Sequence, residues 1–168
     1  MRTGLASDLF ITVIDDHKGI IFKVANSYAK SVEDRKDLVQ EIILQLWRSF
    51  DTYKEEFKYS TWIYRIALNV AISNIRKEKR RSKLFSTMTD SSILELSVET
   101  NEEMEQSSRF LYQFINELKP LDKALVLLYL EDTPQREMAE ILGLSETNIS
   151  TKIHRIKSIL KQKFEALK

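Results

Sequence analysis

Apolar residues recur every three or four positions along most of the chain, which is the spacing of an amphipathic helix. The pattern predicts helices at about 9–29, 32–50, 60–81, 102–118 and 120–132, after a tail or ragged first turn at 1–8. Ser31, with Asp34 three positions later, is typical of a helix N-cap. Ser60 is expected to cap a further helix, and Pro120 to start another. Most of the chain is therefore expected to be helical.

Residues 133–164 carry the clearest local signals. Thr133 can cap a helix whose first residue is Pro134, and Gly143 can end that helix in the left-handed conformation that glycine tolerates. Ser145 then caps a second helix. Two helices joined by a short turn with a glycine form a helix-turn-helix unit, whose second helix enters the major groove of DNA.

The second helix of this unit has an apolar and a polar face. The apolar face can close a small core against the first helix through Ile149, Ile153, Ile156, Leu160 and Phe164. The polar face is short and basic, as suits contacts to base edges and phosphates, and it comprises Thr147, Asn148, Ser150, Thr151, Lys152, His154 and Arg155. Taken alone, these residues fit an ordinary helix pair with a solvated face nearly as well.

The chain divides where periodicity is lost. Residues 82–101 are rich in Ser, Thr and Glu, which indicates a flexible linker between a domain at 1–81 and a second domain at 102–168. Charge divides in the same place, since basic residues crowd 65–83, whereas 87–108 holds six acidic residues and no basic one. The expected fold class is all-α, with two small helical domains joined by an acidic linker.

Two features of the first domain suggest binding surfaces. Leu44 and Trp47 lie on the polar side of the 32–50 helix, as is typical of a protein-docking surface, although Trp47 could instead pack under a loop. The aromatic-rich loop at 52–59 then precedes a basic helix. Bases stack on rings and cations follow phosphates, so this arrangement suits single-stranded nucleic acid, with core aromatics and a solvated basic end as the alternative.

Composition excludes several function classes. The chain has no cysteine, which excludes a disulfide framework and a thiolate metal site. Its two histidines are distant in sequence and no phosphate-binding loop is present, so we expect no catalytic residue, no metal and no cofactor. No apolar run approaches the ~18 residues of a membrane span and no signal-peptide pattern is seen, so a cytoplasmic location is expected.

Two segments resemble a known family. Residues 37–81 and 121–164 are similar to regions 2 and 4 of bacterial RNA polymerase sigma factors, on the strings DLVQE, STWIYRIALN and GLSETNI in this order. The small size and the lack of an intervening globular region resemble the extracytoplasmic-function (ECF) subgroup. The resemblance implies an alternative sigma factor, not an enzyme, that binds core RNA polymerase, recognises promoter DNA and assists melting. The alternative is a helix-turn-helix regulator that acts as a dimer without replacing a sigma subunit.

The resemblance also implies roles for individual residues. Those expected to bind the beta-prime clamp helices of polymerase are Asp37, Gln40, Glu41, Leu44 and Trp47. Those expected to contact the minus-ten element and adjacent upstream DNA are Tyr59, Ser60, Thr61, Trp62, Asn69, Arg76, Lys77, Lys79, Arg80 and Arg81. The polar face of the 145–164 helix is expected to contact the minus-thirty-five element, although Ser150 and Lys152 stand where the family often has arginine. The polymerase beta flap and an anti-sigma factor are further expected partners.

Overall fold

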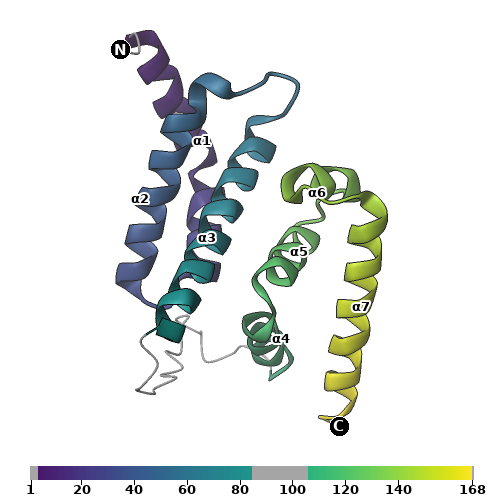
Figure 1. Ribbon diagram of the computed structural model, residues 1–168. Coiled ribbons are helices and arrows are strands. Elements are labelled where there is room, and N and C mark those ends of the chain that lie inside the picture. The colour runs from purple at the N-terminus through teal and green to yellow at the C-terminus, as the bar shows by residue number, and fades with distance from the viewer. Residues whose placement is uncertain (1–3, 85–105, 168) are drawn as a thin grey trace. The chain divides into compact units, whose positions relative to one another are not determined.

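The computed structural model describes residues 4–84 and 106–167, and these residues fall into two helical units (Figure 1). Unit 1 consists of α1 (Gly4–Tyr28), α2 (Val32–Ser49), the short 3-10 helix η1 (Phe50–Thr52) and α3 (Tyr59–Leu84). Unit 2 consists of α4 (Gln106–Glu117), α5 (Pro120–Leu130), α6 (Gln135–Leu142) and α7 (Glu146–Glu165). These two ranges contain no strand, which confirms the all-α prediction.

The linker expected at 82–101 falls mostly outside the described residues. Its first part, 82–84, forms the end of α3, and 85–101 is not among the residues that the structure describes. Within the two described ranges, no helix combines the length and the apolar character that a membrane crossing requires.

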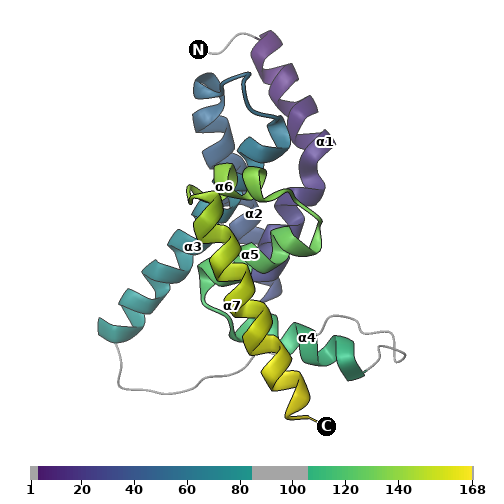
Figure 2. The same cartoon turned by 90° about the vertical axis from the view of Figure 1, so that its right-hand side faces the viewer.

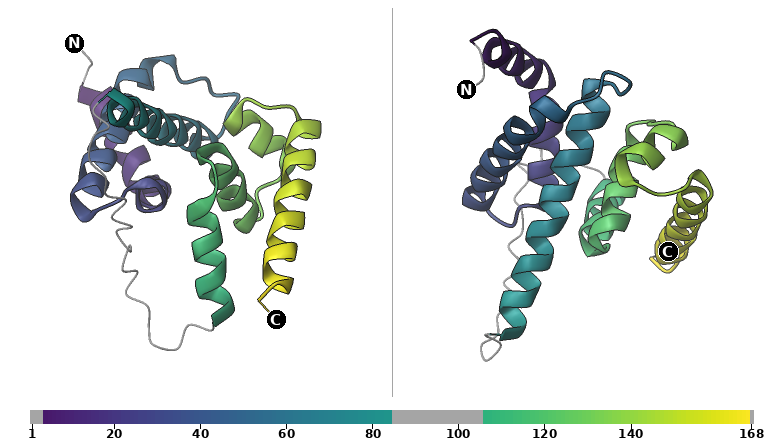
Figure 3. Two further views of the ribbon diagram at one scale, coloured as in Figure 1. Left: turned by 60° about the horizontal axis from the view of Figure 1, so that its bottom comes forward. Right: turned by 45° about the horizontal axis from the view of Figure 1, so that its top comes forward.

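The three long helices of unit 1 run in alternating directions and pack side by side (Figure 1, Figure 3). Their facing sides supply the core, in which the fully buried large side chains are Ile21, Val24, Ile42, Leu46, Ile63 and Leu68. Burial of each such side chain contributes roughly 1.5–3 kcal/mol. This core fixes which sides of α2 and α3 remain exposed.

Two helix starts in unit 1 differ from the predicted ones. Ser31 caps α2 as expected, since its Oγ accepts a hydrogen bond of 3.1 Å from the Asp34 N–H. The cap predicted at Ser60 is wrong, because α3 begins at Tyr59 and its first backbone bond runs from the Trp62 N–H to the Lys58 carbonyl at 3.1 Å. Helix α1 begins at Gly4 rather than near residue 9; its first turns, where Leu5 is 83% exposed, have no buried stripe to mark them.

The helix-turn-helix unit forms from α6 and α7. Gly143 ends α6 with φ of +67°, and the Ser145 Oγ accepts from the Asn148 N–H at 3.1 Å, so both predicted signals are confirmed. The start predicted for α6 is displaced by one residue. Pro134 takes the N-cap position with an extended ψ of 144°, so Thr133 makes no side-chain cap and the helix begins at Gln135.

The core of unit 2 joins the helix-turn-helix to the two helices before it. Helix α7 lies across α5 and α6 (Figure 2), and the fully buried side chains among them are Leu125, Leu128, Met138, Ile141 and Ile149. Ile153 and Ile156 are buried as predicted. Phe164, expected in the same core, is 40% exposed, and its ring meets Phe110 edge-on at 5.5 Å.

Candidate nucleic-acid and protein interfaces

The outward side of α2 carries the residues expected to bind polymerase. Leu44 is 46% exposed, and the predicted polar residues around it, Asp37, Gln40 and Glu41, are exposed as well. The Glu41 carboxylate accepts a hydrogen bond of 2.7 Å from the Asn74 amide of α3. This side of α2 therefore presents a large apolar side chain among charged and polar ones.

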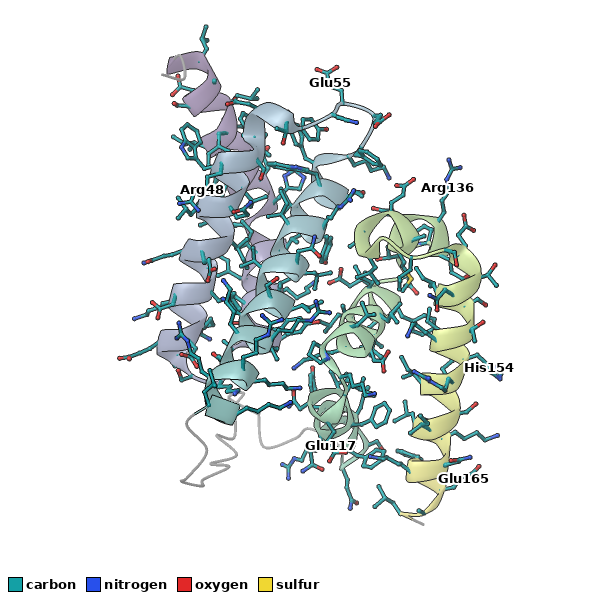
Figure 4. All side chains as sticks on the ribbon, in the orientation of Figure 1. Arg48, Glu55, Glu117, Arg136, His154 and Glu165 are labelled. Carbon is teal, nitrogen blue, oxygen red and sulfur yellow. The ribbon has the colours of Figure 1, made fainter. Side chains whose placement is uncertain are left out.

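Trp47 occupies a different position from Leu44. Its indole is half-buried and meets the ring of Phe10 of α1 edge-on, with centroids 4.9 Å apart. The indole therefore packs against a neighbouring helix rather than under a loop. Arg48, the next residue, points away from the bundle (Figure 4).

A set of aromatic rings continues from Phe10 towards the start of α3. Phe10 contacts Phe50 at 5.2 Å, and Phe50 contacts Trp62 at 6.1 Å. Trp62 meets Tyr53 edge-on at 5.4 Å, and Tyr53 stacks on Tyr59 at 4.4 Å with 18° between the ring planes. Hence the loop between η1 and α3 is lined by rings in mutual contact.

The residues expected at the minus-ten element differ in exposure. Tyr59, Ser60 and Trp62 are half-buried, and Asn69 is exposed. Thr61 is 4% exposed, because it lies on the core side of α3 one heptad before the buried Leu68. The Thr61 side chain thus lies inside unit 1, unlike the other residues of this set.

One exposed stripe follows α3 from the rings to its basic end. Successive members are three or four positions apart, the spacing of one helix face. They are the half-buried Trp62 and the exposed Arg65, Asn69, Ser73, Arg76 and Arg80. Arg65 and Ser73 were absent from the expected set, although the same spacing rule identifies them. Lys77, Lys79 and Arg81 are exposed too, but they point to other sides of the helix than the stripe does.

The polar face of α7 is open along its length. Thr147, Asn148, Ser150, Thr151, His154 and Arg155 are exposed, and Lys152 is half-buried. Figure 4 shows His154 pointing away from α5 and α6. The Thr151 hydroxyl donates to the Thr147 carbonyl at 3.0 Å, which directs it along the helix. The face is therefore polar, basic and free of large apolar side chains.

Arg155 has an acidic neighbour that the sequence did not reveal. Its Nη2 lies 3.8 Å from Oδ2 of Asp122, a side chain of α5 that is 13% exposed. Lys157, two positions further, places its ammonium 4.2 Å from the ring centroid of Tyr129. Both contacts join α7 to α5. The one feature of the sequence that could have drawn attention to Asp122 is its place as an acidic residue in the first turn of α5.

Comparison with known proteins assigns both units. Residues 13–81 match the family model of Sigma-70 region 2, and residues 110–160 match that of Sigma-70, region 4. The chain is 29% identical to the RNA polymerase sigma factor SigV of Bacillus subtilis over 154 residues, which cover 91% of this chain and 89% of SigV. It is 27% identical to the ECF RNA polymerase sigma factor SigW of the same organism, over 95% of this chain and 91% of SigW. The chain belongs to the ECF sigma factors.

Solved structures share the fold of this ECF sigma factor. The sigma factor RpoE from Bartonella quintana, in complex with the anti-sigma factor NepR, has a TM-score of 0.72 at 16% identity and covers 95% of this chain and 96% of its own. CnrH, in complex with the cytosolic domain of CnrY, has a TM-score of 0.66 at 19% identity and covers 95% and 90%.

The family assignment settles the general function. The protein is an alternative sigma factor for transcription initiation, and it binds core RNA polymerase and promoter DNA through its two sigma regions. Sigma factors are initiation factors rather than enzymes. A dimeric helix-turn-helix regulator would account for 110–160 but not for the region 2 match at 13–81.

Proposed function

We propose that this ECF sigma factor divides its contacts among three surfaces. The outward side of α2 around Leu44 binds the beta-prime clamp helices, the rings and the exposed stripe of α3 bind the unwound minus-ten strand, and the polar face of α7 binds the minus-thirty-five duplex. The protein acts in the cytoplasm as a specificity subunit without catalytic activity. The beta flap of polymerase contacts unit 2.

The α3 stripe is the observation that carries the proposal. It begins at the half-buried Trp62 and ends at the exposed Arg80, eighteen positions later, which is about 27 Å along a helix. Rings at one end suit unpaired bases, while guanidinium groups at the other suit phosphates. One helix face can therefore follow DNA from the melted strand to the upstream duplex.

The acting steps are binding steps. Two modest DNA contacts on one polymerase raise each other's effective concentration, so a promoter with both elements is favoured over one with either alone. A base that leaves the duplex loses its stacking there, at a cost of roughly a few kcal/mol. Stacking of that base on Tyr59 or Trp62 would offset this cost. The melted strand is thus held against re-closure, and this chain supplies no hydrolysis.

An anti-sigma factor is part of the proposal. The two solved structures named above hold sigma factors in complex with NepR and with the cytosolic domain of CnrY. In this chain the exposed Leu44 offers an apolar anchor ringed by polar groups, as hot spots commonly do. An inhibitor covering that anchor would compete directly with polymerase.

Transcription in vitro tests the proposal. Purified core polymerase is incubated with a pool of genomic fragments, with and without this protein, and the 5′ ends of the RNA are mapped. We expect new start sites that share two upstream elements. If no new start appeared while the protein alone protected a palindrome from cleavage, the dimeric regulator would be the correct function.

Two substitutions separate the surfaces. Leu44→Ala is expected to weaken core binding about tenfold, the effect of an interface anchor, without altering minus-thirty-five binding. The matched control is Val32→Ala, since Val32 is a 56% exposed apolar residue at the other end of α2. Arg155→Ala should instead lower minus-thirty-five recognition by about tenfold and leave core binding intact.

A further inference from the structure

Tyr53 lies outside every set of residues that the family resemblance assigns to DNA, yet it contacts two of them. Its ring stacks on Tyr59, with centroids 4.4 Å apart and 18° between the planes. The same ring meets the indole of Trp62 edge-on at 5.4 Å and 63°. Tyr53 is therefore the ring that joins the first residue of α3 to the first residue of the exposed stripe.

The polar atoms of Tyr53 fix the ring in place. Its N–H donates to the Phe50 carbonyl at 3.2 Å, which anchors its backbone to η1. Its hydroxyl donates to the Phe57 carbonyl, and the Phe57 N–H in turn donates to the Lys54 carbonyl at 3.1 Å. Side chain and backbone of Tyr53 thereby close the loop that leads into α3.

The hydroxyl is able to keep this role near neutral pH. Partial burial, with smaller effects from Tyr59 and the Glu55 carboxylate, raises the pKa of the Tyr53 hydroxyl above its ordinary value. A tyrosine hydroxyl is already protonated near neutral pH, and this shift acts in the same direction, so the hydroxyl can donate its hydrogen bond.

These contacts bear on how a ring captures a base. Tyr53, Tyr59 and Trp62 are each half-buried, so no deep core holds the latter two rings in position. A ring already ordered by a neighbour loses less conformational freedom on binding than a ring that is free to rotate. The stacked partner of Tyr59 thus favours base stacking without touching the base.

We propose that Tyr53 is a positioning residue for base capture, which orders Tyr59 and Trp62 and closes the 53–57 loop. The inference rests on the proposed function, in which these two rings bind the unwound minus-ten strand. Tyr53 itself need not contact DNA. Its effect passes through the rings of Tyr59 and Trp62, and this distinguishes it from a residue that itself contacts a base.

The test uses holoenzyme assembled from core polymerase and the full chain. The probe is a single-stranded oligonucleotide with the non-template sequence of a mapped promoter, carrying 2-aminopurine in the minus-ten element. Tyr53→Leu, which removes the ring, is expected to weaken probe binding about fivefold, the size of one aromatic pair. Tyr53→Phe, which keeps the ring and loses the hydroxyl bond, is expected to cost about twofold.

Two controls show that the effect is one of positioning. Phe22→Leu makes the same kind of change at a 48% exposed ring of α1, and it should leave probe binding unchanged. In a double-mutant cycle, Tyr53→Leu should cost less in the Tyr59→Leu background than it does alone, because the part of its effect that passes through Tyr59 is already lost. Core binding should be the same for all variants.

Each contrary outcome is informative. The positioning role is overturned if Tyr53→Leu binds the probe as wild type does, if its effect multiplies with that of Tyr59→Leu, or if core binding falls in parallel. Failure of the proposed function looks different, because wild-type holoenzyme itself would then produce no mapped start or would not bind the probe.

Discussion

Gly143 offers a sharp test of the helix-turn-helix geometry. Its φ is +67°, and a Cβ added there would meet no atom within 4 Å. Gly143→Ala therefore adds no clash, and its cost is that of the left-handed backbone alone, roughly 1–2 kcal/mol. For a domain of this size, each kcal/mol corresponds to roughly 4–8 °C in the unfolding midpoint.

Gly19 supplies the matched control. It lies within α1, and a Cβ there would also meet no atom within 4 Å, but its φ is not positive. Gly19→Ala should therefore stabilise unit 1 by roughly 0.5–1 kcal/mol, the helix-propensity difference. The same substitution is expected to have opposite signs in the two units.

Two spectroscopic probes distinguish the units. Both tryptophans, Trp47 and Trp62, lie in unit 1, so indole fluorescence reports its unfolding, whereas far-ultraviolet circular dichroism reports helices of both. We expect Gly143→Ala to lower the dichroism midpoint of unit 2 and leave the fluorescence midpoint unchanged. A fluorescence shift, or no loss of stability at all, would refute the assignment of a strained turn to unit 2 alone.

Three further predictions concern single side chains. Ser145→Ala removes the cap on the Asn148 N–H and should cost unit 2 about 1 kcal/mol in a denaturant titration, while Ser145→Asn should retain most of it. Arg80→Ala, on the α3 stripe, should reduce the slope of log affinity for upstream duplex DNA against log salt by about one, and Lys79→Ala, off the stripe, by less. Trp47→Ala should lower the stability of unit 1, detected by fluorescence, by about 2 kcal/mol, because the Trp47 indole packs on Phe10. It should lower core binding as well, whereas unchanged stability would contradict the packing.

The sequence predicted those features that depend on neighbouring residues. Ser31 and Ser145 cap their helices because each hydroxyl accepts a bond from an N–H three positions later. Gly143 ends α6 because glycine, which has no Cβ, tolerates its φ. The start of α3 was misplaced for a related reason. There Lys58 accepts the first backbone bond of the helix, as Ser31 and Ser145 do in theirs, but a lysine side chain cannot accept a bond from an N–H and so does not mark the position.

Contacts between helices could not be predicted in the same way. The periodicity of α2 placed Trp47 on the polar side, and only the position of α1 brings Phe10 against it. Tyr53 was visible as an aromatic in a loop, but its stacking on Tyr59 depends on the path of the loop. Thr61 was misjudged in the opposite way. The family resemblance suggested that it contacts DNA, whereas its place on the core side of α3 buries the side chain.

The rings of unit 1 connect two surfaces that the proposed function treats separately. Trp47 rests on Phe10, Phe10 contacts Phe50, and Phe50 contacts Trp62 at the start of the α3 stripe. A change at Phe10 or Phe50, the two rings that lie between Trp47 and Trp62, is therefore expected to alter the support of both sides. Leu44 lies outside the series and is exposed, so its removal is expected to change the proposed docking without changing that support. For this reason Leu44, and not Trp47, is the residue by which polymerase binding can be tested independently of base capture.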